Sequence, residues 1–467
     1  MLPDVALLEI FDFCLNAYME HEEEKKSAAW HVLVHVCQIW RNIVFGSPLR
    51  LNLRLYCVPR RTPVRKTIIA WPALPITVSD NCDKIRDNQK WVNNIVAVFE
   101  HIDRICRLDL YEIRSWHLEK VSAAMQQPFP VLTHLGLYSK DGETVPVVPD
   151  SFMGGSAPQL QSLKLGRISF PGLPKLLLSA TRLVLLHLWD IPHSGYIPPE
   201  TMVTCLSVLT RLESLDIEFD SPQSRPDRRS HRPPQTRTLL PVFTSLSFKG
   251  VSEYLEDLMS RIDAPLLTVL TTTFFHQLIF DTPQLTQFIR RRAPNFTTFD
   301  LAILDFLDDS GYLSVKLLPP KGSLYKELVF GTICNQSDWQ LSFLTQMCSL
   351  SCPQGLISAV EYLRIEYCYP DLATPWQDDI EGSQWLELLH PFTGVKTLSI
   401  SEEFTPRVAS ALQELVGERV TEVLPTLQAL ILEETSLSGP VQEAIEQFVA
   451  ARQLVNLPII VSRSKTN

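Results

Sequence analysis

The chain has 467 residues, of which 45% are hydrophobic and 20% are charged, and its formal net charge is −10. This acidic balance argues against general nucleic-acid binding, which usually needs a basic face. The sequence contains no apolar run near the roughly 18 residues that a membrane-spanning helix needs. Its start also lacks the basic region of a secretion signal, so we expect a cytoplasmic or nuclear protein without membrane or nucleic-acid partners.

The first 55 residues are expected to form a small helical domain. A helix should begin near Pro3, because apolar residues follow at helical spacing as far as Leu15. Residues 16–29 have a charged centre, which predicts a solvated insertion or a helix extension. A second helix is expected over about 30–45, and leucines at every second position from 49 to 55 predict a strand.

His31, His35 and Cys37 form a candidate reactive cluster on the second helix. The two histidines have zinc-ligand spacing, but the segment lacks the glutamate of HExxH and no third ligand is indicated. His35 and Cys37 lie about 200° apart around a helix, so they do not face each other. The sequence has neither GxSxG nor a phosphate-binding glycine loop. We therefore predict a protein that is not an enzyme and has no catalytic residues, cofactor or metal.

Residues 56–104 are expected to connect two domains. The stretch 59–75 is rich in proline, and 91–105 predicts a helix. Further along, the segment 221–237 is basic and proline-rich, which predicts a loop. Near the end, 405–420 and 439–454 predict amphipathic helices, the second with Ser438 as a candidate N-cap.

Residues 105–467 contain a recurring apolar hexad of the LxxLxL type. The copies recur at intervals of roughly 23 to 35 residues, near or above the 20–29 of leucine-rich repeats. Each hexad predicts a short strand whose last two apolar residues point inward, and stacking of neighbours would bury them. The hexads are 105–110, 132–137, 160–165, 183–188, 212–217, 243–248, 267–272, 296–301, 325–330, 360–365, 395–400 and 427–432.

The repeats depart from the regular pattern, because the Asn/Cys ladder position is absent and the units are uneven. We therefore predict an α/β protein in which a small all-α N-terminal domain precedes an irregular leucine-rich-repeat-like solenoid. The alternative is that the hexads are strands of another α/β fold.

The N-terminal segments LPDVALLEIF (2–11) and WHVLVHVCQIWRNIVFGSPLRLNLRL (30–55) together resemble an F-box. That motif opens with Leu-Pro, continues with Leu and Ile on a first helix, and ends with Val-Cys-x-x-Trp. The matching residues here are Leu2, Pro3, Leu8, Ile10, Val36, Cys37 and Trp40. The rest of the chain is similar to F-box proteins of mushroom-forming fungi, in phrases such as RTPVRKTIIAWPALPI (61–76) and WLELLHPFTGVKTLSI (385–400). The insertion at 16–29 and a motif that starts at the first residues of the sequence depart from the typical box.

The resemblance implies a substrate-recognition subunit of a Skp/cullin/F-box-type E3 ubiquitin ligase. The F-box would bind a Skp-type adaptor, and through it a cullin, whereas the repeats would bind a protein substrate. The candidate adaptor contacts are Leu2, Pro3, Leu8, Ile10, Phe11 and Trp40. Phe11 and Trp40 could instead be internal core of the box.

The candidate substrate contacts are the side chains that point outward from the predicted strands. They are His134, Tyr138, Lys164, His187, Trp189, Asp216, Glu218, Lys249, Tyr362, Arg364 and Glu366. Exposed aromatic residues suit the hot spots of protein interfaces, but these positions could equally be ordinary strand surface. The alternative functions are an F-box/leucine-rich-repeat scaffold that acts outside a ubiquitin ligase, and an enzyme with an unrecognised site.

Overall fold

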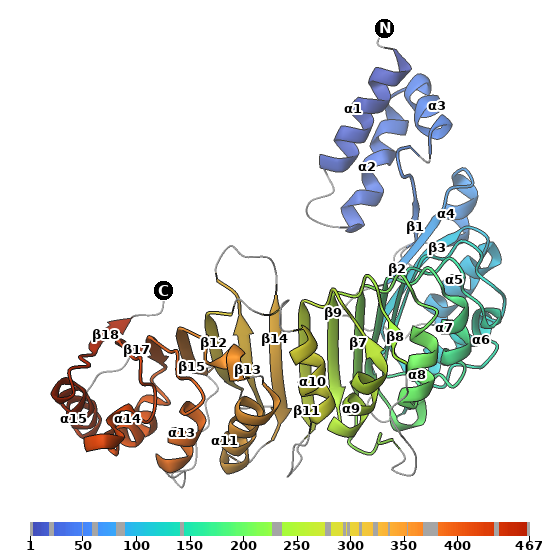
Figure 1. Cartoon of the computed structure of the whole chain (residues 1–467). Helices are drawn as coiled ribbons and strands as arrows, with labels where there is room; N and C mark the ends of the chain where they lie inside the picture. Colours follow the sequence, from blue (N-terminus) through green and yellow to red (C-terminus); the bar gives the residue numbers. More distant parts are fainter. Residues whose placement is uncertain are drawn as a thin grey trace. The chain divides into compact units, whose positions relative to one another are not determined.

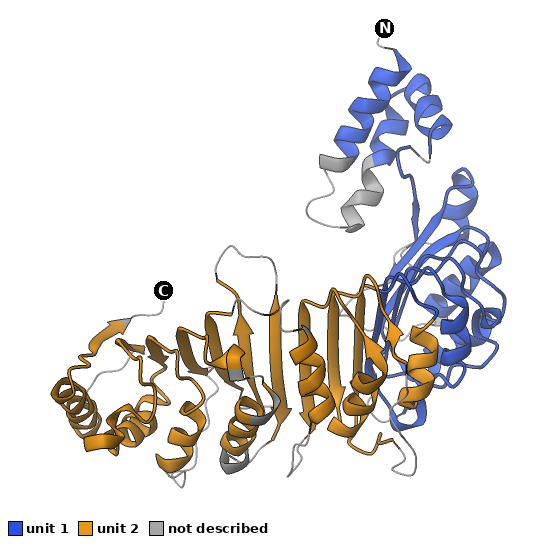
Figure 2. Cartoon of the chain, in the orientation of Figure 1, with its two compact units in different colours: residues 1–197, 208–212 blue, residues 198–207, 213–467 orange. Residues whose placement is uncertain are grey.

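The computed structural model contains two compact units (Figure 2). Unit 1 comprises residues 1–197 and 208–212, and unit 2 comprises residues 198–207 and 213–467. The structure describes residues 3–17, 23–48, 50–57, 64–80, 89–140, 144–226, 236–275, 282–292, 296, 299–307, 311–320, 326–334, 337–352, 354–367, 382–433 and 439–464. Each unit combines parallel strands with helices, so the chain is a mixed α/β protein, as the sequence predicts.

Unit 1 begins with a helical module of three helices: α1 (Asp4–Ala17), α2 (Glu23–Val36) and α3 (Gln38–Gly46) (Figure 1). The single helix expected over about 30–45 is wrong, because the chain leaves helical geometry at Cys37, with φ −159° and ψ 171°. The Cys37 sulfur accepts the backbone N–H of Trp40 at 3.5 Å and so caps α3. Helix α2 begins within the stretch expected as an insertion or helix extension.

The helical module has its own core, and aromatic contacts join it to the residues that follow. The ring of Phe11 lies 4.8 Å from the ring of Trp40. Trp30 is buried, and its Nε1 donates to the carbonyl oxygen of Arg54 at 3.1 Å. The ring of Trp71 packs edge-on against Trp30 at 5.1 Å. These contacts attach α2 to the start of the sheet of unit 1.

Unit 1 continues as a sheet of parallel strands in the order β1-β2-β3-β4-β5-β6. The strands are β1 (Leu55–Cys57), β2 (Ile76–Asp80), β3 (Ile105–Ile113), β4 (His134–Ser139), β5 (Ser162–Gly166) and β6 (Leu185–Ile191). The helices after the module are α4 (Val64–Ala70), α5 (Gln89–Val98), α6 (Ser115–Ala124) and α7 (Leu173–Ser179).

Two expectations for unit 1 need correction. The segment 56–104 is more than a connection, because it carries most of β1, all of β2, and helices α4 and α5, and β2 pairs in parallel with β3. The strand expected over 49–55 begins only at Leu55, because residues 50–52 form a turn. The leucines at 51 and 53 are nevertheless buried, so their alternating pattern indicates burial and not a strand.

Unit 2 contains strands in the order β7-β9-β11-β14-β13-β12-β15-β16-β17-β18, and a separate short pair, β8 with β10. The strands are β7 (Ser214–Phe219), β8 (Thr238–Leu239), β9 (Ser245–Gly250), β10 (Ile262–Asp263), β11 (Val269–Phe275), β12 (Leu301–Leu307), β13 (Tyr312–Leu318), β14 (Glu327–Ile333), β15 (Tyr362–Tyr367), β16 (Thr397–Ile400), β17 (Ala429–Glu433) and β18 (Ile460–Ser464).

The helices of unit 2 line one side of the strands (Figure 1). They are α8 (Pro199–Leu206), α9 (Ser252–Arg261), α10 (Pro283–Arg292), α11 (Ser337–Gln346), α12 (Gln354–Ile357), α13 (Gly382–Leu389), α14 (Thr405–Gln413) and α15 (Pro440–Leu454). Sequence neighbours in this layer pack together, as α9 does with α10 and α13 with α14. Helix α14 is shorter than the helix expected over 405–420, and the candidate cap Ser438 lies outside the described residues.

The strands β12, β13 and β14 interrupt the simple progression of repeats. Strand β13 is antiparallel to both neighbours, whereas β12 and β14 keep the common direction. The chain also runs backwards across the sheet here, because β14 lies beside β11 and β12 lies beside β15. Strand β12 begins at Leu301, the last residue of the hexad 296–301, so this hexad does not form the expected strand.

Most other hexads place their last two apolar residues in the core. In β5, Leu163 and Leu165 are buried, whereas Ser162 before them and Lys164 between them are half-buried. The same alternation occurs in β7, β9 and β15. The period-two prediction is therefore confirmed for these strands, and it defines an outward row of half-buried side chains on each of them.

Candidate functional site

The helical module places the predicted adaptor contacts in different environments. Ile10 is 44% exposed and Pro3 is also exposed, whereas Trp40 is half-buried. Leu8 and Phe11 are only 8% and 0% exposed, because they face the core that α1 shares with α2 and α3. Their placement on a docking surface is therefore corrected to a core position. Leu2 lies outside the described residues.

The module also exposes apolar residues that the sequence did not identify as docking candidates. Phe13 on α1 is 75% exposed, and it lies on the side of the helix opposite the buried Phe11 side. Val32 and Val36 on α2 are 66% and 55% exposed, and Ile39 on α3 is 44% exposed. The sequence spacing could have predicted the exposure of Val32 and Val36. These two residues are one helical turn apart and face away from the buried positions of α2. The module thus leaves exposed apolar side chains on all three helices.

The histidines of α2 pack against an aromatic ring. His31 stacks on Trp71 at 4.8 Å with an interplanar angle of 10°, and His35 lies edge-on to the same ring at 6.1 Å. Burial, and to a smaller extent His35, lowers the pKa of His31. Within the described ranges, no group of three His, Cys, Asp or Glu residues is spaced to hold a metal ion. These histidines therefore have a packing role at the junction of the module with the sheet.

In unit 1, the outward rows of β4, β5 and β6 gather several predicted substrate contacts. The parallel register places Lys164 beside His187, and Gly166 between Tyr138 and Trp189. The Tyr138 ring covers Gly166, where the Cβ of any other residue would collide with it. His134 belongs to the same sheet and contacts the Thr133 hydroxyl through Nδ1 at 2.8 Å. The expected grouping of these side chains on neighbouring strands is thus present.

Ion pairing and burial set the charge of this surface. Both the Tyr138 hydroxyl, at 3.4 Å, and Arg167 Nε, at 3.1 Å, donate to Oδ2 of Asp190. Burial, with a smaller contribution from the Lys164 ammonium, lowers the pKa of His187 to about 4. The imidazole is therefore neutral at pH 7, and the side chain presents a ring rather than a charge.

In unit 2, the outward row of the strands carries an ion-pair network. Arg364 Nη1 lies 3.4 Å from Oε2 of Glu366, and Arg364 Nε lies 3.6 Å from Oε1 of Glu433. Lys316 pairs with the buried carboxylate of Asp305. Burial, and then the nearby carboxylates, raise the pKa of Glu366 despite the opposing charge of Arg364. The network thus contains three carboxylates and two cations, those of Lys316 and Arg364.

The sequence pointed to only some members of this network. It identified Arg364 and Glu366, whereas Asp305 and Lys316 lie on β12 and β13, whose reversed order the hexads do not reveal. The remaining predicted contacts lie on outward rows as expected. Asp216, Glu218, Lys249 and Tyr362 are all half-buried, and Glu218 lies opposite Lys249.

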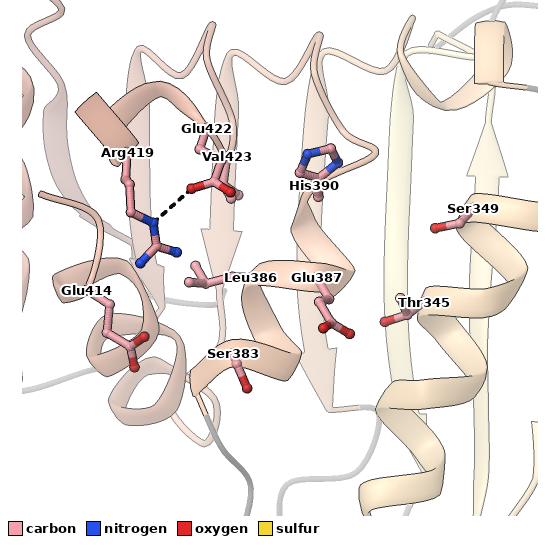
Figure 3. A pocket seen from close by; sticks show the side chains of 10 residues that line it. All are labelled: Thr345, Ser349, Ser383, Leu386, Glu387, His390, Glu414, Arg419, Glu422 and Val423. Carbon is pink, nitrogen blue, oxygen red and sulfur yellow. Dashed lines mark hydrogen bonds and ion pairs between the residues drawn. The ribbon is translucent and has the colours of Figure 1, made fainter. Parts of the chain in front are cut away.

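A cavity of about 600 Å³ lies in the helix layer of unit 2 (Figure 3). Sequence reasoning missed it, because its residues come from separate helices and carry no local motif. The Nε of Arg419 lies 2.9 Å from Oε2 of Glu422 on one wall. The lining residues are Thr345, Ser349, Ser383, Leu386, Glu387, His390, Glu414, Arg419, Glu422 and Val423.

In the described part of the chain, no helix has the length and apolar character to cross a membrane. No protein-family model matches the sequence, and no curated protein matches it. Among solved structures, the chain is similar to the leucine-rich repeat-containing protein LegL7 from Legionella pneumophila, with a TM-score of 0.29 and 12% sequence identity. That comparison covers 80% of this chain and 88% of the other.

Proposed function

We propose that this protein is a non-enzymatic substrate receptor of a Skp/cullin/F-box-type ubiquitin ligase. Its helical module would bind a Skp-type adaptor, and the outward rows of the strands would bind a protein substrate. One observation carries the proposal: the module has its own buried core and still exposes Ile10, Phe13, Val36 and Ile39. Exposed apolar side chains that are not needed for the core are typical of a docking surface.

The helices of the module are also long enough to be bound by a partner. Helices α1 and α2 each have 14 residues and α3 has 9, so each presents two or more turns. A partner that binds a helix contacts side chains three and four positions apart, because these lie on the same face of the helix. Ile10 with Phe13 and Val32 with Val36 have this spacing. The F-box resemblance of the sequence supports a Skp-type adaptor as the partner.

The outward rows support substrate binding through their residue types. Tyr138 on β4 and Trp189 on β6 flank Gly166 of β5, near Lys164 and His187, and aromatic side chains dominate the hot spots of protein interfaces. Glycine at 166 leaves room for the Tyr138 ring against β5. This arrangement fixes a large aromatic side chain in place before any partner binds, which lowers the entropic cost of binding.

The test uses two surface variants of the full chain, Ile10→Glu with Phe13→Glu and Val36→Glu with Ile39→Glu. Burying one such side chain contributes about 1.5–3 kcal/mol, so loss of a buried pair should weaken adaptor binding by about 100-fold or more. Ile69→Glu is the matched control, because Ile69 is 82% exposed on α4, outside the module.

Co-purification with a Skp-type adaptor and circular dichroism are measured for each variant. We expect at least one double variant to lose the adaptor while it keeps its helix content, and Ile69→Glu to retain the adaptor. Adaptor recovery equal to that of the unmodified chain in both double variants would refute the proposal. Adaptor binding without cullin recruitment would instead favour a scaffold outside the ligase.

A further inference from the structure

The outward face of β4, β5 and β6 in unit 1 carries a cation that has no carboxylate beside it. Lys164 lies in the middle of this face, and the strand register places it next to His187. Lys164 is half-buried, and in the part of the chain that the structure describes it makes no ion pair or hydrogen bond. Three neighbouring cations do pair with carboxylates: Arg107 with Asp109, Lys140 with Glu112, and Arg167 with Asp190. Lys164 is therefore the cation that remains for the negative charge of a partner.

The Tyr138 ring is held in one position on the same face. Gly166 leaves room for the ring, since a Cβ at that position would collide with it. The Tyr138 hydroxyl donates to Oδ2 of Asp190 at 3.4 Å, and Nε of Arg167 donates to the same oxygen at 3.1 Å. Arg167 and Asp190 both have a left-handed backbone, with φ of 55° and 46°, which is unfavourable for residues with a side chain. The ring is thus positioned before a partner binds, which lowers the cost of binding.

Trp189 supplies a second ring on the other side of β5. The register places Gly166 between Tyr138 and Trp189, so these two aromatic residues lie two strands apart, about 10 Å at the backbone. An extended peptide advances about 3.1–3.4 Å per residue. In a peptide that crosses the strands, side chains three positions apart can therefore each contact one ring. Lys164 precedes Gly166 by two residues, about 7 Å along β5, so its side chain can reach a residue between the two.

The charge of this face selects the class of residue that a partner would present. Burial lowers the pKa of His187 to about 4, so this imidazole adds no charge to that of Lys164 at pH 7. A single ammonium matches the single charge of a carboxylate, and it repels a basic residue. Phosphorylated motifs are bound by clusters of arginines, whereas the two arginines named above already pair with Asp109 and Asp190. An acidic residue with apolar neighbours therefore fits this face best.

We propose that this face binds a substrate segment in which one acidic residue lies between two apolar residues three positions apart. The carboxylate of that segment pairs with Lys164, and its two apolar side chains pack on Tyr138 and Trp189. The inference rests on the proposed function, because the bound segment is taken to belong to the protein substrate. It adds the chemical class of the motif that the receptor recognises.

The test selects binders of the full chain from a phage-displayed library of random peptides, at about 50 mM salt, where screening is weak. We expect the recovered peptides to share an Asp or Glu between two apolar residues. The most frequent peptide is then synthesised with a fluorescent label, together with a version in which the acidic residue is replaced by its amide. Fluorescence anisotropy should show that the acidic peptide binds about tenfold or more tightly, because the amide lacks the charge that pairs with the ammonium.

Three variants of the full chain locate this selectivity, and the melting temperature of each shows that it is folded. Lys164→Gln should bring the ratio of the two affinities close to one. Lys164→Arg retains the positive charge and should keep the ratio. Lys175→Gln is the matched control, because Lys175 is an exposed residue of α7 outside this face, and it should also keep the ratio.

Failure to recover any peptide, or recovery of peptides without a shared acidic residue, would overturn the proposal. A ratio that survives Lys164→Gln in the folded variant would overturn it as well. None of these measurements uses a Skp-type adaptor, so the two proposals fail separately. An unmodified chain that binds the acidic peptide selectively but does not bind the adaptor would refute the ligase function alone.

Discussion

Replacing Arg452 with methionine tests how a buried charge organises the end of unit 2. The guanidinium is fully buried and donates to four backbone oxygens, those of Val420, Leu424, Pro425 and Leu427, at 3.0 to 3.4 Å. Hydrogen bonds from a charged donor contribute about 1.5–3 kcal/mol each. Burial of the charge costs several kcal/mol in return. The net destabilisation by Arg452→Met should therefore be about 3–5 kcal/mol, since three buried carbonyls and one partly buried carbonyl lose their donor.

Hydrogen exchange with mass spectrometry of the full chain measures this effect locally, because repeat proteins open in segments. A loss of about 3 kcal/mol corresponds to an increase of about 150-fold in amide exchange. We expect this increase in peptides that cover 417–433 and 440–454. Arg463→Met, at an exposed position of β18, is the control and should change little. A change below about threefold for Arg452→Met would refute the role assigned to these hydrogen bonds.

Two further predictions concern unit 1 and unit 2 separately. The folded pKa of His187 is about 4, below its ordinary value of 6.5, so the unfolded chain binds more protons between these values. The free energy of unfolding should thus fall as pH drops from 6.5 towards 4. His187→Gln should make the pH dependence of the melting temperature shallower. The same pH dependence in the variant and the unmodified chain would contradict the lowered pKa of His187. Gly394→Ala should destabilise by about 1–3 kcal/mol, because a Cβ there collides with the backbone oxygen of Ser358. Gly355→Ala on α12 meets open space and should be neutral or stabilising in the same urea titration, so equal effects of the two changes would contradict the packing.

The repeated hexads predicted much of the fold, because a strand buried on one side must alternate with a period of two. Leu363 and Ile365 in β15 are buried as that rule requires, and Arg364 between them is half-buried. The reversed order of β12, β13 and β14 could not be predicted, because strand pairing depends on contacts far apart in sequence.

The site residues divide in a similar way. The outward position of Lys164 and His187 followed from strand periodicity alone. The break at Cys37 escaped notice, because the apolar spacing continues through it and neither glycine nor proline marks it. Burial of Phe11 depends on how three helices pack, and the cavity around Glu387 depends on three separate helical segments. Neither the packing of helices nor the assembly of a cavity from separate segments can be predicted from local sequence patterns.

The most direct test of the proposed function is a binding measurement between the purified full chain and a purified Skp-type adaptor. Size-exclusion chromatography with light scattering reports whether the two form a complex and in which ratio. The account predicts a stable one-to-one complex that is lost in at least one of the two double variants, Ile10→Glu with Phe13→Glu or Val36→Glu with Ile39→Glu. Separate elution of the two unmodified proteins at micromolar concentration, with the full chain folded, would contradict it.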